Sequence, residues 1–226
     1  MSTSRRRSKT AAPPKPAAMG ATELTKDYGD LVALSPTDLR VEKGEAVVLV
    51  GHNGSGKTTL LRMAAGLLEP SGGTVELGGH LAGTLGARAA TSYLSDSPTF
   101  YEDLSVWEHL EYTARLHGVH DWEQDAADLL GALGLYDRAD DLPTRFSRGL
   151  KQKAAIALAF IRPFDVLLVD EPFVGLDAAH EEGSALVVAT HELAFVHRVA
   201  RCVALRDGHV IHDGPTEGLD VLGLVT

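Results

Sequence analysis

Residues 45–68 read EAVVLVGHNGSGKTTLLRMAAGLL, and this stretch decides the fold. Its first part, residues 45–50, is a short apolar run that is typical of one buried strand. A glycine-rich loop follows directly, and the apolar residues of 59–68 recur with helical spacing. The stretch therefore predicts a strand, a loop and a helix in direct succession.

The loop Gly51–Thr58 fits the pattern G-x-x-x-x-G-K-[ST] of the phosphate-binding P-loop. Glycines let backbone N–H groups turn inward around phosphates, and the helix that follows begins with an electropositive end. We expect Lys57 to reach the β and γ phosphates of ATP and the Thr58 hydroxyl to bind Mg²⁺. Further contacts to the nucleotide are expected from Asn53, Gly54, Ser55, Gly56 and Thr59. The alternative, a chance glycine-rich turn, does not account for the strand and helix around it.

A second apolar strand, VLLVDE at residues 166–171, ends in two acidic residues. Asp170 fits the Walker B role of holding the metal ion. Adjacent residues of a strand point to opposite faces, so we expect Glu171 to do a different job and to polarise the attacking water. A surface pair of acids at a strand end is the alternative, and we would favour it if no P-loop preceded the strand.

The remaining patterns predict an α/β fold: a P-loop NTPase with a mostly parallel sheet core, an N-terminal antiparallel β subdomain and a helical subdomain. Residues 185–189 and 202–205 are continuously apolar, as in parallel strands that helices cover on both faces. Residues 104–117 and 122–135 have the spacing of amphipathic helices, with Ser105 and Asp121 as N-caps. Further predicted elements are strands at 21–26, 38–41, 71–79 and 90–94 and a helix at 152–161.

The charge of the chain argues against a nucleic-acid partner. Its net charge is -10, although the first eighteen residues contain three arginines, two lysines and no acid. The rest of the chain is therefore acidic, whereas a nucleic-acid surface needs lysine and arginine to neutralise phosphates. We expect residues 1–20 to be a disordered basic tail, with contact to anionic lipid as the alternative.

Two further features bear on the cellular compartment. Cys202 is the only cysteine, which excludes an internal disulfide and fits a reducing compartment. The longest apolar stretches are far shorter than the ~20 residues that a spanning helix needs. Because no apolar segment of a signal peptide follows the arginines either, we expect a cytoplasmic protein.

Residues 146–153, FSRGLKQK, lie shortly before the Walker B strand and resemble the signature motif of the ATP-binding-cassette (ABC) family, usually LSGGQ. Ser147 and Gly149 match that motif, Arg148 and Leu150 depart from it, and the form S-R-G-hydrophobic-K-Q is similar to bacterial export-type cassettes. Ser147 also reads as the N-cap of a helix, whose N-terminus is an anion site.

Other positions of the family pattern appear in the same order. Tyr28 lies where the family places an aromatic ring against adenine, Gly175–Asp177 matches the D-loop, and His191 matches the switch histidine that contacts the γ-phosphate. The resemblance spans residues 21 to 215, so we assign 21–226 to one ABC ATPase domain with a helical subdomain inserted at about 96–160.

Two departures from the family pattern stand out. Asp96 occupies the place of the Q-loop glutamine, where its carboxylate could hold Mg²⁺ while adding negative charge near the triphosphate. The segment between Asp177 and His191 is also too short for the usual helix and turn. Either that helix is reduced or the sequence lacks residues here; we favour the second, because losing a covering helix would expose the sheet to water.

The resemblance implies an ATP-hydrolysing subunit of a membrane transporter. Two cassettes would enclose ATP and Mg²⁺ between the P-loop of one and the signature, Ser147 and Gly149, of the other. Glu171, His191 and Lys57 would serve hydrolysis, and the Q-loop and the helices of 104–135 would pass movement to a separate transmembrane permease. The subunit would be peripheral on the inner face of the membrane.

Two alternatives remain open at this point. A non-transport ABC ATPase acting on DNA or ribosomes would usually carry coiled-coil inserts, paired cassettes or basic surfaces, which this sequence lacks. A regulatory subunit that binds ATP without hydrolysing it is suggested by Asp96 and the short segment after Asp177. The presence of Lys57, Asp170, Glu171 and His191 argues against it.

Overall fold

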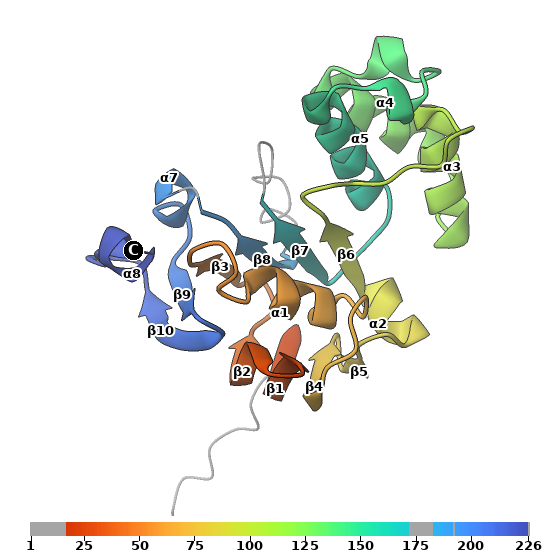
Figure 1. Ribbon diagram of the computed structural model, residues 1–226. Coiled ribbons are helices and arrows are strands. Elements are labelled where there is room, and N and C mark those ends of the chain that lie inside the picture. The colour runs from red at the N-terminus through yellow and green to blue at the C-terminus, as the bar shows by residue number, and fades with distance from the viewer. Residues whose placement is uncertain (1–16, 172–182, 192, 226) are drawn as a thin grey trace, which may run out of the picture.

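The computed structural model describes residues 17–171, 183–191 and 193–225, which form two β-sheets, the helices around them and a helical lobe (Figure 1). The larger sheet has the order β10-β9-β3-β8-β7-β6, and all its neighbouring strands are parallel except β9 and β10. Its strands are β3 (Ala46–Val50), β6 (Thr91–Leu94), β7 (Val166–Asp170), β8 (Ala185–Ala189), β9 (Arg201–Arg206) and β10 (His209–Pro215). This sheet confirms the predicted mostly parallel core.

The second sheet is antiparallel and has the order β2-β1-β4-β5, which agrees with the predicted N-terminal β subdomain. Its strands are β1 (Met19–Tyr28), β2 (Leu31–Val41), β4 (Gly72–Leu77) and β5 (His80–Leu81). Met19 and Gly20, which the prediction placed in the tail, are the first residues of β1. Ala18 and Met19 are fully buried, because they pack into the core between the two sheets.

Helix α1 (Lys57–Ala64) packs between the two sheets, where Leu60, Leu61 and Met63 are fully buried (Figure 1). The prediction extended this helix to residue 68, but it ends earlier. Gly66 has a φ of +69°, and a Cβ there would lie 2.4 Å from the backbone nitrogen of Gly83. Because the chain needs this left-handed turn to pass Gly83 closely, the helix cannot continue.

The helical lobe is formed by α3 (Val106–Leu116), α4 (Trp122–Leu133) and α5 (Arg148–Phe160), with two short 3-10 turns at Tyr136–Arg138 and Pro143–Arg145. It has its own hydrophobic core, in which Leu110 and Leu130 are fully buried. Figure 1 shows it standing beyond the β6 edge of the large sheet. The lobe matches the predicted helical subdomain.

Two details of the predicted helix ends need correction. Ser105 caps α3 as predicted, and with Glu108 it forms a complete capping box. Asp121 lies at the N-cap position of α4 but makes no side-chain cap, because its backbone is left-handed with a φ of 56°. Helix α5 begins at Arg148 rather than at residue 152, since the Ser147 hydroxyl accepts a hydrogen bond from the Leu150 N–H at 3.5 Å.

Three short helices complete the described residues: α2 (Leu85–Ala90), α7 (Leu193–Val196) and α8 (Val221–Val225). In the described ranges, no helix combines the length and the apolar content that crossing a membrane requires. Cys202 is buried in the core, as its apolar surroundings predict. Residues 1–16 of the tail, the D-loop Gly175–Asp177 and residues 178–182 of the short segment after it lie outside the described residues.

Candidate functional site

The P-loop connects β3 to α1 and leaves the start of the helix open. Gly56 occupies the N-cap position of α1 and supplies no side-chain cap, so the first N–H groups of the helix face the loop without a side-chain partner from that position. Its φ of +107° is a conformation that L side chains rarely adopt. The local sequence therefore builds an anion site from backbone groups and a helix dipole.

Lys57 is buried beneath this loop, with an exposed fraction of 5%. Its Nζ donates hydrogen bonds to the backbone oxygens of Gly51 at 2.7 Å and of His52 at 3.1 Å. Burial lowers the pKa of the Lys57 ammonium, while the charges of Glu171 and Asp170 act in the opposite direction. The Lys57 ammonium is thus a poorly hydrated cation, and a bound polyanion would form a stronger hydrogen bond with it than with a fully hydrated one.

Thr58 and Asp170, predicted to hold the metal ion, lie together. The Thr58 hydroxyl donates to Asp170 Oδ1 at 3.1 Å, which joins the first turn of α1 to the end of β7. Burial raises the pKa of Asp170, as do the nearby charges of Glu171 and Asp96, against the effects of Thr58 and Lys57. Asp170 is a buried carboxylate next to the Thr58 hydroxyl, and the positive charge around it is too small to balance it. Oxygen ligands of this kind suit Mg²⁺.

Glu171 and His191 form a second pair at the carboxyl ends of β7 and β8. His191 Nδ1 lies 2.6 Å from Glu171 Oε2, and its ring is 65% exposed. Glu171 has a left-handed backbone with a φ of 58°, and its N–H donates to the carbonyl of Ala189 in the next strand. The Glu171 carboxylate is thus directed toward His191, while the predicted roles of the two residues, toward the attacking water and the γ-phosphate, stay predictions.

Lys57, Thr58, Asp170 and Glu171 line one open cleft of about 600 Å³, whereas His191 is not among its lining residues. Its walls include eleven of the predicted site residues: Tyr28, Asn53, Gly54, Ser55, Gly56, Lys57, Thr58, Thr59, Asp96, Asp170 and Glu171. Tyr28 is 54% exposed, and Lys26 Nζ lies 5.1 Å from the centre of its ring. An aromatic ring with a free face at the edge of a phosphate site suits the predicted stacking on adenine.

The remaining predicted residues do not line this cleft, and the Asp96 carboxylate, which does line it, contacts Arg148. Ser147 and Gly149 begin α5 and do not line the cleft. Asp96 lines the cleft, but its Oδ1 accepts a hydrogen bond from Arg148 Nη2 at 2.6 Å. In the described part of the chain, no three His, Cys, Asp or Glu side chains are grouped to hold a metal. The predicted metal role of Asp96 therefore stays a prediction.

The cleft also contains residues that the sequence analysis missed. Arg62 lies four residues after Thr58, so helical spacing along α1 could have indicated it. Asp207 reaches the cleft from the turn between β9 and β10, where Gly208 N–H donates to the carbonyl of Ser55. No local signal connects that turn with the P-loop, because their contact depends on the strand order.

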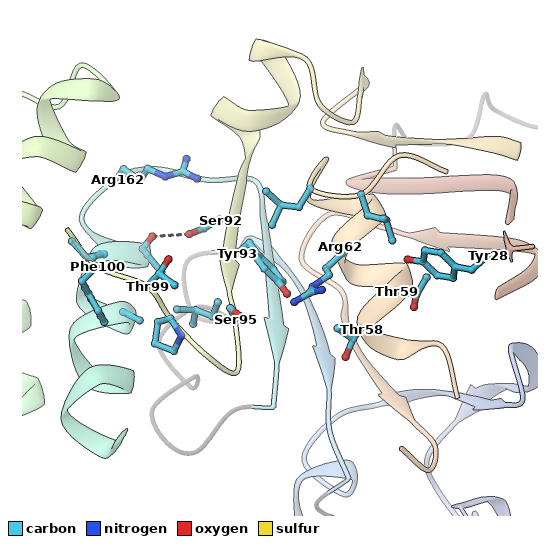
Figure 2. Close-up of a pocket in the computed structure, with 17 residues that line it drawn as sticks. Tyr28, Thr58, Thr59, Arg62, Ser92, Tyr93, Ser95, Thr99, Phe100 and Arg162 are labelled. Carbon is cyan, nitrogen blue, oxygen red and sulfur yellow. Dashed lines mark hydrogen bonds between the residues drawn. The ribbon is translucent and has the colours of Figure 1, made fainter. Parts of the chain in front are cut away.

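A second cleft of about 630 Å³ adjoins the first and is shown in Figure 2. Tyr28, Thr58, Thr59 and Arg62 line both clefts. From there the second cleft runs past Tyr93 and Ser95 to Phe100 and Arg162, between α1 and the start of the helical lobe (Figure 2). It thus links the phosphate site to the Q-loop region.

We expect the φ of Gly56 to be essential to the P-loop. A Cβ at this position would lie 2.7 Å from the backbone oxygen of Ala33, so Gly56→Ala should destabilise the fold by at least about 2 kcal/mol. Thermal or urea unfolding measures this loss. Gly131→Ala in α4, where nothing lies within 4 Å of the added Cβ, is the matched control and should be neutral or slightly stabilising. Equal unfolding of the two variants would contradict the expectation.

The mostly parallel sheet, the P-loop opening α1 and the acids at the end of β7 define the class: this is a P-loop nucleoside triphosphatase fold. A family model described as ABC transporter matches residues 34–174. The chain belongs to the ABC transporter family, as its signature motif predicts.

Individual relatives agree with this assignment. The SkfA peptide export ATP-binding protein SkfE of Bacillus subtilis (strain 168) is 30% identical over 212 residues, which cover 86% of this chain and 88% of that protein. The macrolide export ATP-binding/permease protein MacB 2 of Yersinia pestis bv. Antiqua (strain Antiqua) is 31% identical over 205 residues, which cover 81% of this chain and 30% of that protein. A solved structure of an ATP-binding subunit of an ABC transporter aligns with a TM-score of 0.85 at 27% identity, over 92% of this chain and 97% of that one. These names support a transport role over the non-transport alternative.

Proposed function

We propose that this chain is the ATP-hydrolysing subunit of an ABC transporter, working with a separate transmembrane permease and driving export. The observation that carries the proposal is the meeting of Lys57, Thr58 and Asp170 in one cleft at an uncapped helix N-terminus. Export is the proposed direction because SkfE and MacB 2, which resemble this chain over most of its length, are named for export.

ATP would bind through two parts of the cleft: the P-loop would contact its phosphates and Tyr28 its adenine. The Lys57 ammonium and the N–H groups at the start of α1 would hold the phosphates, and the exposed face of Tyr28 would stack on the adenine. Burial has already removed water from Lys57, so a phosphate oxygen would replace carbonyl contacts without first displacing a full hydration shell.

Thr58 and Asp170 would hold Mg²⁺, which when bound neutralises charge on the β and γ phosphates. Glu171 would take a proton from the attacking water or orient that water, because its carboxylate lies beside Asp170 and is only partly exposed. His191, 2.6 Å from Glu171, would fix the direction of this carboxylate. The chain itself thus supplies phosphate binding, metal binding and water activation.

A second ATP-binding subunit would complete the site. Ser147 and Gly149 do not line the cleft of their own chain, although they open a helix whose N-terminal end favours anions. We propose that they face the phosphates bound by another subunit, so that two nucleotides lie between two cassettes. Nucleotide would then favour the closed pair, and hydrolysis would release it.

The permease would dock on the second cleft, at the cytoplasmic side of the membrane. Apolar groups of Phe100, Leu158 and Leu67 line this cleft together with the cations Arg62 and Arg162. A cytoplasmic segment of the permease with apolar side chains and an acidic residue would complement it. Because Thr58 and Arg62 also line the phosphate cleft, docking here would link the permease to the nucleotide.

Thr99→Glu tests this docking. Thr99 is exposed and lines the second cleft together with Arg62 and Arg162, so an added carboxylate there should repel an incoming acidic segment and weaken the complex at least about tenfold. The measurement is co-purification in detergent with a co-expressed candidate permease, together with ATP hydrolysis by the complex. Thr74→Glu adds the same charge on an exposed position of β4 and should leave the complex intact. Equal complex formation by both variants would contradict the proposed docking site.

A further inference from the structure

Two departures from the usual ABC pattern meet in the structure. Asp96 stands where the Q-loop glutamine is expected, and Arg148 stands where the signature motif has its first glycine. These residues are 52 positions apart in the chain, yet Arg148 Nη2 donates to Asp96 Oδ1 at 2.6 Å. A charge-assisted hydrogen bond of this length is among the stronger polar contacts of a protein. The two departures are therefore one structural feature.

Helix α5 also holds the backbone at this point. Gln152 is buried, and its Nε2 donates to the backbone oxygen of Asp96 at 2.8 Å. The other carboxylate oxygen, Oδ2, lies 3.4 Å from the hydroxyl of Ser97. Both the position and the direction of the Asp96 side chain thus depend on the first turns of α5 and on the adjacent loop residue.

The place of Asp96 makes its charge important. Its side chain lines the same cleft as Lys57, Thr58 and Asp170, where the phosphates of ATP are proposed to bind. A carboxylate in that position repels a triphosphate unless a cation neutralises it or it turns away. The contact with Arg148 does both, because the guanidinium brings a positive charge and draws Oδ1 toward α5.

We propose that Arg148 is a positioning residue for nucleotide binding, which acts through Asp96 by neutralising this carboxylate and holding it away from the phosphates. The inference rests on the proposed function. It assigns to the arginine of the signature motif a task within its own subunit, separate from the proposed task of Ser147 and Gly149 toward a second subunit.

The solvent exposure of Arg148 and Asp96 indicates that their contact should affect ATP affinity rather than folding stability. The side chains of Arg148 and Asp96 are 67% and 40% exposed, and ion pairs this open to water add little to folding stability. Removing Arg148 should therefore leave the unfolding temperature nearly unchanged. A released negative charge near the phosphates should instead weaken ATP binding about fivefold, which is the effect of one unit charge about 4 Å from another in water.

Four proteins test the proposal: the native chain, Arg148→Ala, Asp96→Gln and the double variant. The measurement is the Kd of a non-hydrolysable ATP analogue with Mg²⁺, determined by calorimetry at a concentration where light scattering shows monomers. Arg148→Ala should bind about fivefold more weakly than the native chain, whereas Asp96→Gln and the double variant should stay within about twofold of it. Rescue of Arg148→Ala by Asp96→Gln is the result that a merely structural role would not produce.

Arg138→Ala is the matched control, because it breaks an ion pair of the same lobe, Arg138 with Asp141 at 3.2 Å, whose side chains are both 52% exposed. It should leave the Kd unchanged.

Three results would overturn the inference. Native affinity in Arg148→Ala would show that the pair does not affect the nucleotide. A double variant as weak as Arg148→Ala would show that the arginine acts on the nucleotide directly. A large loss in Asp96→Gln would show that this carboxylate is itself needed, as a magnesium ligand would be. Absence of binding to the native chain would instead contradict the proposed function, so the two failures are distinguishable.

Discussion

Glu171→Gln is expected to abolish ATP hydrolysis while leaving ATP binding intact. The amide has nearly the same shape as the carboxylate and still reaches His191, but it cannot accept a proton from the attacking water. General base catalysis contributes about 10²–10⁴-fold to rates, so we expect steady-state phosphate release to fall at least about a hundredfold. The Kd for ATP with Mg²⁺ should change little, because Lys57, Thr58 and Asp170 remain in place.

The same variant tests the proposed pairing of two subunits. With hydrolysis blocked, the closed pair should accumulate when ATP and Mg²⁺ are present, and light scattering should report a doubled mass. Glu217→Gln, which removes the same charge from an exposed position, should hydrolyse ATP like the native chain and show no accumulation. Equal and negligible rates for the native chain and Glu171→Gln would favour the regulatory alternative. No increase in mass with ATP would count against the paired site.

Most residues that line the candidate phosphate cleft could be named from the sequence, because they belong to local patterns. The strand before the P-loop, the loop itself and the start of α1 are contiguous, and each has a period or a residue pattern of its own. Asp170 and Glu171 follow an apolar strand whose burial on both faces could be read directly. The contact of Asp170 with Thr58 follows from one rule, that parallel strands present their carboxyl ends at the same edge of the sheet.

The elements that were missed depend on partners distant in the sequence. Strand β10 reads HVIHDGP, which includes a glycine and a proline and has mostly exposed or half-exposed side chains, so no buried face marks it as a strand. The extended conformation of β10 depends on its pairing with the buried strand β9. Likewise β2 begins at Leu31, ahead of the predicted start at residue 38, because its exposed first residues pair with the end of β1.

The contact between Asp96 and Arg148 shows the same limit for function. Each residue could be recognised from the sequence as a departure from the family pattern, but their separation of 52 positions hid their contact. The position of α5 against the segment after β6 brings them together. Sequence comparison thus locates unusual residues, and only the fold shows that these two are in contact.

The burial of Lys57 lowers the folding stability of the chain and at the same time provides a cation for the phosphates. Burying an ammonium group lowers its pKa and opposes folding, and the carbonyls of Gly51 and His52 only partly compensate. The linkage has a definite sign. Since the unfolded chain holds the proton more tightly than the folded chain, this destabilisation is fully present at low and neutral pH. It disappears as the pH rises toward 10.5, the ordinary pKa of lysine.

Lys57→Met should therefore weaken ATP binding without lowering the folding stability of the chain. A charge-assisted hydrogen bond is worth about 1.5–3 kcal/mol, so removing the ammonium should weaken ATP binding about tenfold to 150-fold, as measured by calorimetry. The unfolding temperature at pH 7 should equal or exceed that of the native chain, and the difference should shrink as the pH is raised. Lys43→Met, which removes an exposed lysine paired with Asp165 at 3.5 Å, is the control and should bind ATP normally. A variant at Lys57 that unfolds early would mean that the ammonium stabilises the empty loop, and one that binds ATP normally would remove the P-loop cation from the proposed site.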